Sequence, residues 1–346
     1  MRKQFVNICL LLATLIACQQ ETQKYLNPSD VFGVTDTLRA TILPEPLMAN
    51  SIMFRLYHTR KGLILNTQID KYVIQLIDTT TGKRLASAGR IGRGPDELIN
   101  PAGMSYNYDS GSYFVWDYNL SRLEMFAITD SIVKKRSMSN INLTLQTLDA
   151  ITDTTFAVLD FCPDQSIGII DTNGRYLSRI PYKIVDDKSI DYKTHFFNSN
   201  IDISPDRKYL VAACSKFSNI CLYSIKDNKL SLIWDKMMFR PKYDLSKGWI
   251  KIDNEQLRGF SAVNMSNQLI YVCSQGITTG EWRKEKTISR KNSTYILIFD
   301  LKGKLMKTYV MDKYFLVFTI TPDGRTLYAV IDDPDLYIAK YSLYEK

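Results

Sequence analysis

A β-strand, a tight turn and a second β-strand recur five times along the chain, and this repeat constrains the fold more than any other feature. The first strand of each copy is a short apolar run, and polar residues form the turn that follows. Asn173-Gly174 and Lys302-Gly303 favour hairpins, because such turns need a positive φ. The five strand segments are residues 73–78, 123–128, 167–171, 220–225 and 296–300, and a sixth is residues 336–341.

Two further strands precede this pair in each repeat. Residues 204–213 and 321–330 have nearly the same sequence, and each has Pro-Asp near its start, which suits a type I turn. Four strands in a period of roughly 40–55 residues are typical of a propeller blade. We therefore expect an all-β fold, a six-bladed β-propeller with four-stranded antiparallel blades. A seven-bladed propeller is the alternative, if residues 236–258 contain a degenerate blade.

The last repeat lacks a fourth strand. Residues 36–43 have the composition of a strand but precede the first repeat. Pairing this segment with the last blade would close the ring and remove two exposed sheet edges. We therefore expect an N-terminal strand to complete the propeller.

The N-terminal residues have the pattern of an export signal. Arg2 and Lys3 precede an apolar run that is too short to span a bilayer. The run ends at Ala17-Cys18, which resembles the bacterial lipobox and implies a lipid on the Cys18 thiol, with cleavage before it. A plain signal peptide is the alternative. The expected domains are a lipoprotein signal peptide (1–17), the lipidated cysteine and a flexible tether (18–35), and the propeller (36–346).

Composition excludes several classes of function. The net charge of +8 comes without a dense Lys/Arg block, which argues against nucleic acid as a partner. Only two histidines are present, which excludes a multi-histidine metal site. We expect no cofactor and no metal. Cys214 and Cys221 could face each other across a hairpin, either as a disulfide or as buried free thiols.

Two motifs add a family resemblance. A motif close to G-x-G-P-x-E-[FL] is matched at Gly92, Gly94, Pro95, Glu97 and Leu98. The segment from Trp116 to Leu123 is similar to the loop of NHL-type blades, with matches at Asp117, Asn119 and Arg122. With the lipobox and the repeat, the chain resembles the TolB-like six-bladed propeller lipoproteins of Bacteroidetes-type bacteria. The resemblance implies the fold and the lipid anchor but no defined activity.

In a propeller, the connections from second to third strands and from each blade to the next lie on one face. Residues 236–258 and 274–293 are the longest of these connections, and long loops are usually functional or disordered. The glycines of 92–97 could present N–H groups to an anion, or could form a structural connector. The binding candidates on this face are Arg90, Arg93, Asp117, Asn119, Arg122, Trp249, Arg258, Trp282 and Arg283.

The sequence favours binding over catalysis. It has no G-x-S-x-G, no H-E-x-x-H and no P-loop, and His195 is the only plausible general base on the candidate face. We expect a binding or scaffolding module for a protein or glycan, exported and lipid-anchored to the cell envelope at the outer membrane. A lyase or hydrolase with its site at the channel mouth is the alternative.

Overall fold

The structure is a computed structural model that describes residues 32–33, 36–49, 55–138, 145–160, 165–185, 190, 197–246, 249–284, 294–332 and 335–344. The chain divides into two compact units, Met1–Val34 and Thr35–Lys346, and every strand belongs to the second. Within the described ranges, no helix is long and apolar enough to cross a membrane.

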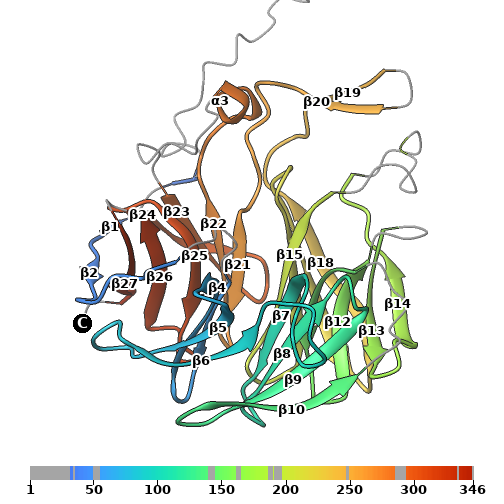
Figure 1. Cartoon of the computed structure of the whole chain (residues 1–346). Coiled ribbons are helices and arrows are strands. Elements are labelled where there is room, and N and C mark those ends of the chain that lie inside the picture. Colours follow the sequence, from blue (N-terminus) through green and yellow to red (C-terminus); the bar gives the residue numbers. More distant parts are fainter. Residues whose placement is uncertain are drawn as a thin grey trace, which may run out of the picture. The chain divides into compact units, whose positions relative to one another are not determined.

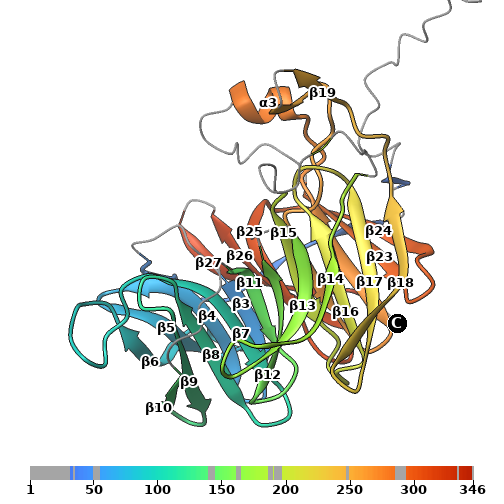
Figure 2. The same ribbon diagram turned by 90° about the vertical axis from the view of Figure 1, so that its right-hand side faces the viewer.

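The second unit consists of six blades (Figures 1 and 2). Each blade is a sheet that contains four antiparallel strands, ordered from the channel outward. Blades 1 to 3 each use four successive strands. Blade 1 is β3 (Arg55–Thr59), β4 (Gly62–Ile69), β5 (Tyr72–Ile77) and β6 (Arg84–Arg90). Blade 2 is β7 (Pro101–Asn107), β8 (Ser112–Asp117), β9 (Arg122–Ile128) and β10 (Ile132–Met138). Blade 3 is β11 (Leu145–Ala150), β12 (Thr155–Asp160), β13 (Ser166–Asp171) and β14 (Tyr176–Pro181).

Blades 4 to 6 continue the pattern with one hairpin inserted between blades 4 and 5. Blade 4 is β15 (Ser199–Ile203), β16 (Tyr209–Cys214), β17 (Asn219–Lys226) and β18 (Lys229–Met237). The inserted hairpin is β19 (Tyr243–Ser246) and β20 (Trp249–Ile252). Blade 5 is β21 (Ala262–Met265), β22 (Leu269–Ser274), β23 (Thr294–Asp300) and β24 (Leu305–Met311). Blade 6 contains β25 (Phe315–Ile320), β26 (Thr326–Asp332) and β27 (Leu336–Ser342).

The first strands of the blades contact one another in a closed circle, β3 to β7, β11, β15, β21, β25 and back to β3. This confirms the six-bladed propeller. The seven-bladed alternative is wrong, because residues 236–258 contain only the end of β18 and the small hairpin β19–β20. The strands β19 and β20 form a two-stranded sheet with each other and no blade.

Residues 36–43 close the ring, as expected, but they divide between two blades. β2 (Thr41–Ile42) pairs antiparallel with β27 and supplies the missing fourth strand of blade 6. β1 (Asp36–Leu38) pairs parallel with β24 and adds a fifth strand to blade 5. The Asp312 carboxylate accepts a hydrogen bond from the Ala40 N–H at 3.1 Å, which holds the chain as it crosses between the blades.

The apolar pattern of the strands explains how the blades stack. Middle strands such as β8 are buried along their whole length, because both faces pack against neighbouring blades. The outer strand β14 alternates between exposed and partly buried residues, because only one of its faces packs. Cys214 and Cys221 are buried free thiols, so the disulfide alternative is wrong. Gly174 and Gly303 have φ values of 75° and 78°, as the predicted hairpin turns require.

Candidate functional site

One polar side chain from the first strand of each blade lies in the axial channel, and together the six form a ring. Except for Tyr57, which precedes His58, each is flanked by apolar residues in sequence. Each of the six forms a hydrogen bond with the backbone of the next blade. The six residues of this polar ring are Tyr57, Ser105, Asp149, Asp202, Asn264 and Thr319.

Four members of the polar ring accept a hydrogen bond from a backbone N–H, and two donate to a carbonyl. The Ala150 N–H donates to Ser105 Oγ at 2.6 Å, and the Ile203 N–H donates to Asp149 Oδ2 at 3.0 Å. The Met265 N–H donates to Asp202 Oδ2 at 2.5 Å, and the His58 N–H donates to Thr319 Oγ1 at 3.2 Å. The Tyr57 hydroxyl donates to the Met104 carbonyl, and Asn264 Nδ2 donates to the Phe318 carbonyl at 3.3 Å. The bonds cross all six seams between blades, so the ring stabilises the closed propeller.

Sequence reasoning missed the polar ring. The signal that could have found most of it is the recurrence of one polar residue between two apolar residues near the end of the first strand in blades 2 to 6, as in Leu148-Asp149-Ala150 and Ile201-Asp202-Ile203.

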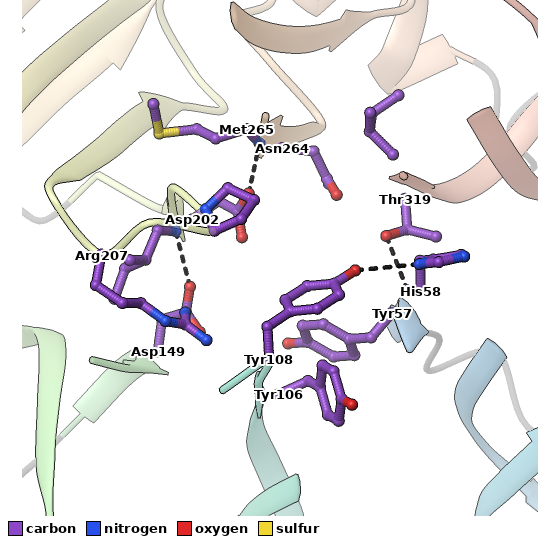
Figure 3. A pocket seen from close by; sticks show the side chains of 13 residues that line it. Tyr57, His58, Tyr106, Tyr108, Asp149, Asp202, Arg207, Asn264, Met265 and Thr319 are labelled. Atoms are coloured by element: carbon purple, nitrogen blue, oxygen red, sulfur yellow. Dashed lines mark hydrogen bonds between the residues drawn. The ribbon is translucent and has the colours of Figure 1, made fainter. Parts of the chain in front are cut away.

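Five members of the polar ring, all except Ser105, line a small cavity (Figure 3). Pro205 and Arg207 of the β15–β16 turn also line it, so it lies near the hairpin-turn end of the channel, which we call the turn side. The cavity volume is about 30 Å³. That is room for a water molecule or two and is too small for an organic ligand. Most polar groups around the cavity already form hydrogen bonds with the backbone, so the main role of the polar ring is structural.

Two carboxyl groups face this cavity, and burial raises the pKa of both. The pKa of Asp149 rises to about 6, and the pKa of Asp202 rises further because the negative charge of Asp149 adds to the effect of burial. The positive charge of Arg207 partly opposes both shifts. Arg207 donates to the Ala150 carbonyl at 3.2 Å and to Asn107 Oδ1 at 2.9 Å.

His58, which is not among the predicted site residues, also lies at this cavity on the turn side. The His58 ring stacks between the rings of Tyr108 and Tyr328, its Nδ1 is 3.3 Å from the Tyr108 hydroxyl, and burial lowers its pKa. His195 lies outside the described residues. In the part of the chain that the structure describes, no group of three or more His, Cys, Asp or Glu side chains is placed to hold a metal ion.

A larger cleft opens at the other end of the channel, which we call the loop side. Its volume is about 420 Å³, within the range of small-molecule sites. Arg55 Nη1 donates to Asn200 Oδ1 at 3.3 Å and so links blade 1 to blade 4. The buried Gln146 Oε1 has no hydrogen-bond partner among the described residues. The cleft is lined by Arg55, Leu145, Gln146, Asn198, Ser199, Asn200 and Ser215.

The β19–β20 hairpin and α3 (Thr279–Lys284) project beyond the blades on the loop side, and we call them the crown (Figures 1 and 2). The two parts are joined directly. The Gly280 N–H donates to the Asn254 carbonyl at 2.8 Å, and Arg283 Nη1 donates to Asn254 Oδ1 at 2.6 Å. The long loops 236–258 and 274–293 therefore meet on the expected face.

The crown brings three of the predicted binding residues together. The Arg258 guanidinium lies 4.2 Å from the centroid of the Trp282 ring, and Trp282 is 42% exposed. Arg283 is on the same helix as Trp282. Trp249 begins β20, and its side chain lies outside the described part of the chain. The binding role of all four stays a prediction.

The remaining candidates lie on the same face, at blades 1 and 2, and most contact other parts of the chain. Glu97 accepts a hydrogen bond from the Gly94 N–H at 2.7 Å and pairs with Arg90 Nε at 3.2 Å. A Cβ on Gly92 would clash with the Glu97 carboxylate. The turn of residues 92–97 is thus filled by its own carboxylate, which is the geometry of the structural connector. Arg93 is exposed.

The NHL-like loop supports that connector. The buried Asp117 carboxylate accepts hydrogen bonds from the N–H groups of Ile99, Asn100, Asn119 and Leu120. Arg122 donates to the Pro95 and Glu97 carbonyls at 3.3 and 3.0 Å. The Asn119 side chain accepts from Asn100 Nδ2 at 3.1 Å. These contacts hold the seam between blades 1 and 2, and a binding role for these residues also stays a prediction.

Comparison with known proteins agrees with this architecture. A crystal structure of a member of the DUF4221 family from Bacteroides vulgatus is similar, with a TM-score of 0.57, 12% identity, and coverage of 89% of this chain and 96% of that one. Hydrazine synthase from Kuenenia stuttgartiensis has a TM-score of 0.46 and 16% identity over 85% of this chain and 75% of that one, a similarity too low to bear on function. A search of curated proteins finds no match.

The family model described as "TolB-like 6-blade propeller-like" matches residues 66–323, which is more than half of the chain. It spans all of blades 2 to 5 and parts of blades 1 and 6. The chain therefore belongs to the TolB-like six-bladed propeller family.

Proposed function

We propose that the protein is a binding module of the cell envelope that holds a glycan at the loop side of its channel. The observation that carries this proposal is the cleft of about 420 Å³, whose lining residues, apart from Leu145, all have amide, hydroxyl or guanidinium groups. Amide and hydroxyl groups both donate and accept hydrogen bonds, and a guanidinium donates them, as the hydroxyls of a sugar require. The partly exposed Trp282, in the crown on the same side of the propeller, offers a flat apolar ring to a sugar face.

A glycan suits this cleft better than a protein does. The cores of protein interfaces are rich in aromatic and other apolar side chains, whereas Leu145 is the only apolar residue in the lining of the cleft.

A lipid anchor would hold this site at the outer membrane, and it has its own test. Cys18→Ser should abolish incorporation of a labelled fatty acid and leave the protein unprocessed or released, because the thiol is the acceptor atom. Cys9→Ser is the matched control, since Cys9 lies in the segment expected to be removed. Unchanged labelling of the Cys18→Ser protein would contradict the anchor.

Glycan binding can be tested on an oligosaccharide array, followed by calorimetry with the saccharides that bind. Trp282→Ala and Trp249→Ala should each weaken binding about tenfold or more, which corresponds to about 1–2 kcal/mol, with little change in melting temperature. Asn173→Ala, at an exposed turn on the opposite face, should bind as the wild type does.

Three results would count against the proposal. Binding to no saccharide, with capture of a protein through the crown, would make the module a protein binder. A larger loss from Asn173→Ala than from Trp282→Ala would place the site on the turn side. Cleavage of the bound saccharide, seen by mass spectrometry, would favour the lyase or hydrolase alternative.

A further inference from the structure

The Arg258 side chain is half-buried and has no anion beside it in the part of the chain that the structure describes. Its guanidinium lies over the Trp282 ring, 4.2 Å from the ring centroid. Burial alone lowers its pKa. A guanidinium has five N–H donors, and partial removal from water without an acceptor is costly. Such a group is suited to receive an anion from outside the protein.

A second cation lies near Arg258. Lys216 Nζ lies over the Phe197 ring, 5.6 Å from its centroid. Burial lowers the pKa of Lys216, and the positive charge of Arg258 lowers it further, so the two charges act on each other. A carboxylate or sulfate that reaches both side chains would be attracted by both positive charges.

The backbone places both cations next to the cleft. The N–H of Gly259 donates to the Ser215 carbonyl at 3.2 Å, and the N–H of Phe260 donates to the Cys214 carbonyl at 2.8 Å. Arg258 and Lys216 therefore extend from two segments that are hydrogen-bonded to each other. Ser215, which lies in one of these segments, lines the cleft.

We infer that the ligand at the loop side is an acidic saccharide whose carboxylate or sulfate binds at Arg258 and Lys216, while its neutral hydroxyls bind in the amide-lined cleft. This inference rests on the proposed glycan-binding function and specifies the ligand class. Guanidinium groups bind carboxylate and sulfate oxygens through paired N–H donors, which makes Arg258 the residue that discriminates the acid from a neutral sugar.

Matched saccharides test the inference in the full-length protein. The acidic probes are oligogalacturonate, alginate, hyaluronan and heparin fragments. Each is paired with its carboxyl-reduced or desulfated counterpart, which keeps the sugar chain and loses the charge. The wild type should bind at least one acidic probe about tenfold or more tightly than its neutral partner. Its affinity should fall as the salt concentration rises.

Substitutions then assign the discrimination to residues. Arg258→Gln should remove most of the preference for the acidic probe while keeping the affinity for the neutral one. Arg258→Lys should restore part of it, because the charge returns without the paired donors. Lys216→Gln should weaken the binding of the acidic probe and leave the binding of the neutral probe unchanged. This second variant keeps the test valid if Arg258→Gln fails to fold. Lys229→Gln, exposed on the turn side, should change nothing.

The outcomes separate this inference from the function on which it rests. Equal binding of acidic and neutral partners would overturn the inference and leave glycan binding intact. Binding of no saccharide would overturn both. Inorganic sulfate that competes as strongly as the acidic saccharides would show a simple anion site and also overturn the inference.

Discussion

A chain that begins at Pro44 should lose most of the stability of the propeller, whereas a chain that begins at Thr41 should lose only part of it. The first truncation removes β1 and β2, so blade 6 keeps three strands and its edge strand β27 is exposed. The second removes β1 alone and leaves blades 5 and 6 with four strands each. The reference is a chain that begins at Thr35, where the compact unit starts.

The size of the effect follows from what the two strands bury. Leu38 and Leu43 are 8% and 4% exposed, and the Leu43 N–H donates to the Ile338 carbonyl at 2.8 Å. A fully buried leucine contributes about 1.5–3 kcal/mol, so loss of both should reduce the free energy of unfolding by about 3–6 kcal/mol. The exposed edge of β27 should also promote aggregation.

Chemical denaturation of the three chains measures these differences. Deletion of residues 19–30 from the full-length protein is a further control, since the sequence predicts a tether there. Equal stabilities of the chains that begin at Thr35 and Pro44 would show that β2 does not hold the ring closed.

Asp202→Asn should stabilise the propeller at pH 8 and reduce the dependence of its melting temperature on pH. In the wild type, burial raises the pKa of Asp149 to about 6, above its value of about 3.9 in an unfolded chain. The stabilising effect of this raised pKa is fully present below about pH 4 and is lost as the pH rises through about 6. The raised pKa of Asp202 acts in the same direction.

The asparagine keeps the hydrogen bond and removes the charge. Its amide oxygen can accept from the Met265 N–H as Asp202 Oδ2 does, and Asp149 no longer has a second carboxylate near it. His58 has the opposite pH dependence because burial lowers its pKa. It is present in both proteins, so its contribution cancels in their difference.

Melting temperatures measured from pH 5 to pH 8 give that difference directly. The melting temperature of Asp202→Asn should exceed that of the wild type most at pH 8 and least at pH 5. Asp130→Asn, whose side chain is 94% exposed, is the control and should follow the wild type. Parallel curves for wild type and Asp202→Asn would mean that Asp202 carries no buried charge at neutral pH.

The sequence by itself determined the repeat, the six blades and the need for an N-terminal strand. The repeat and the stacking of successive blades depend on interactions between neighbours in the chain, whereas the closing strand pairs with the far end of the chain. The hairpin at Asn173-Gly174 forms through a local turn, and the apolar runs of each blade bury themselves against whatever blade comes next. A segment that completes a three-stranded last blade is likewise predictable, because an open edge is unfavourable wherever it occurs.

Only the tertiary structure decided which polar groups meet. Asp149 and Asp202 lie in separate repeats, each in an ordinary strand, and they become neighbours only because the blades turn about a common axis. Arg258 and Trp282 likewise meet because two loops of different blades bond to each other. The division of residues 36–43 between blades 5 and 6 has the same cause. Contacts between blades depend on their relative rotation, and strand periodicity carries no information about that rotation.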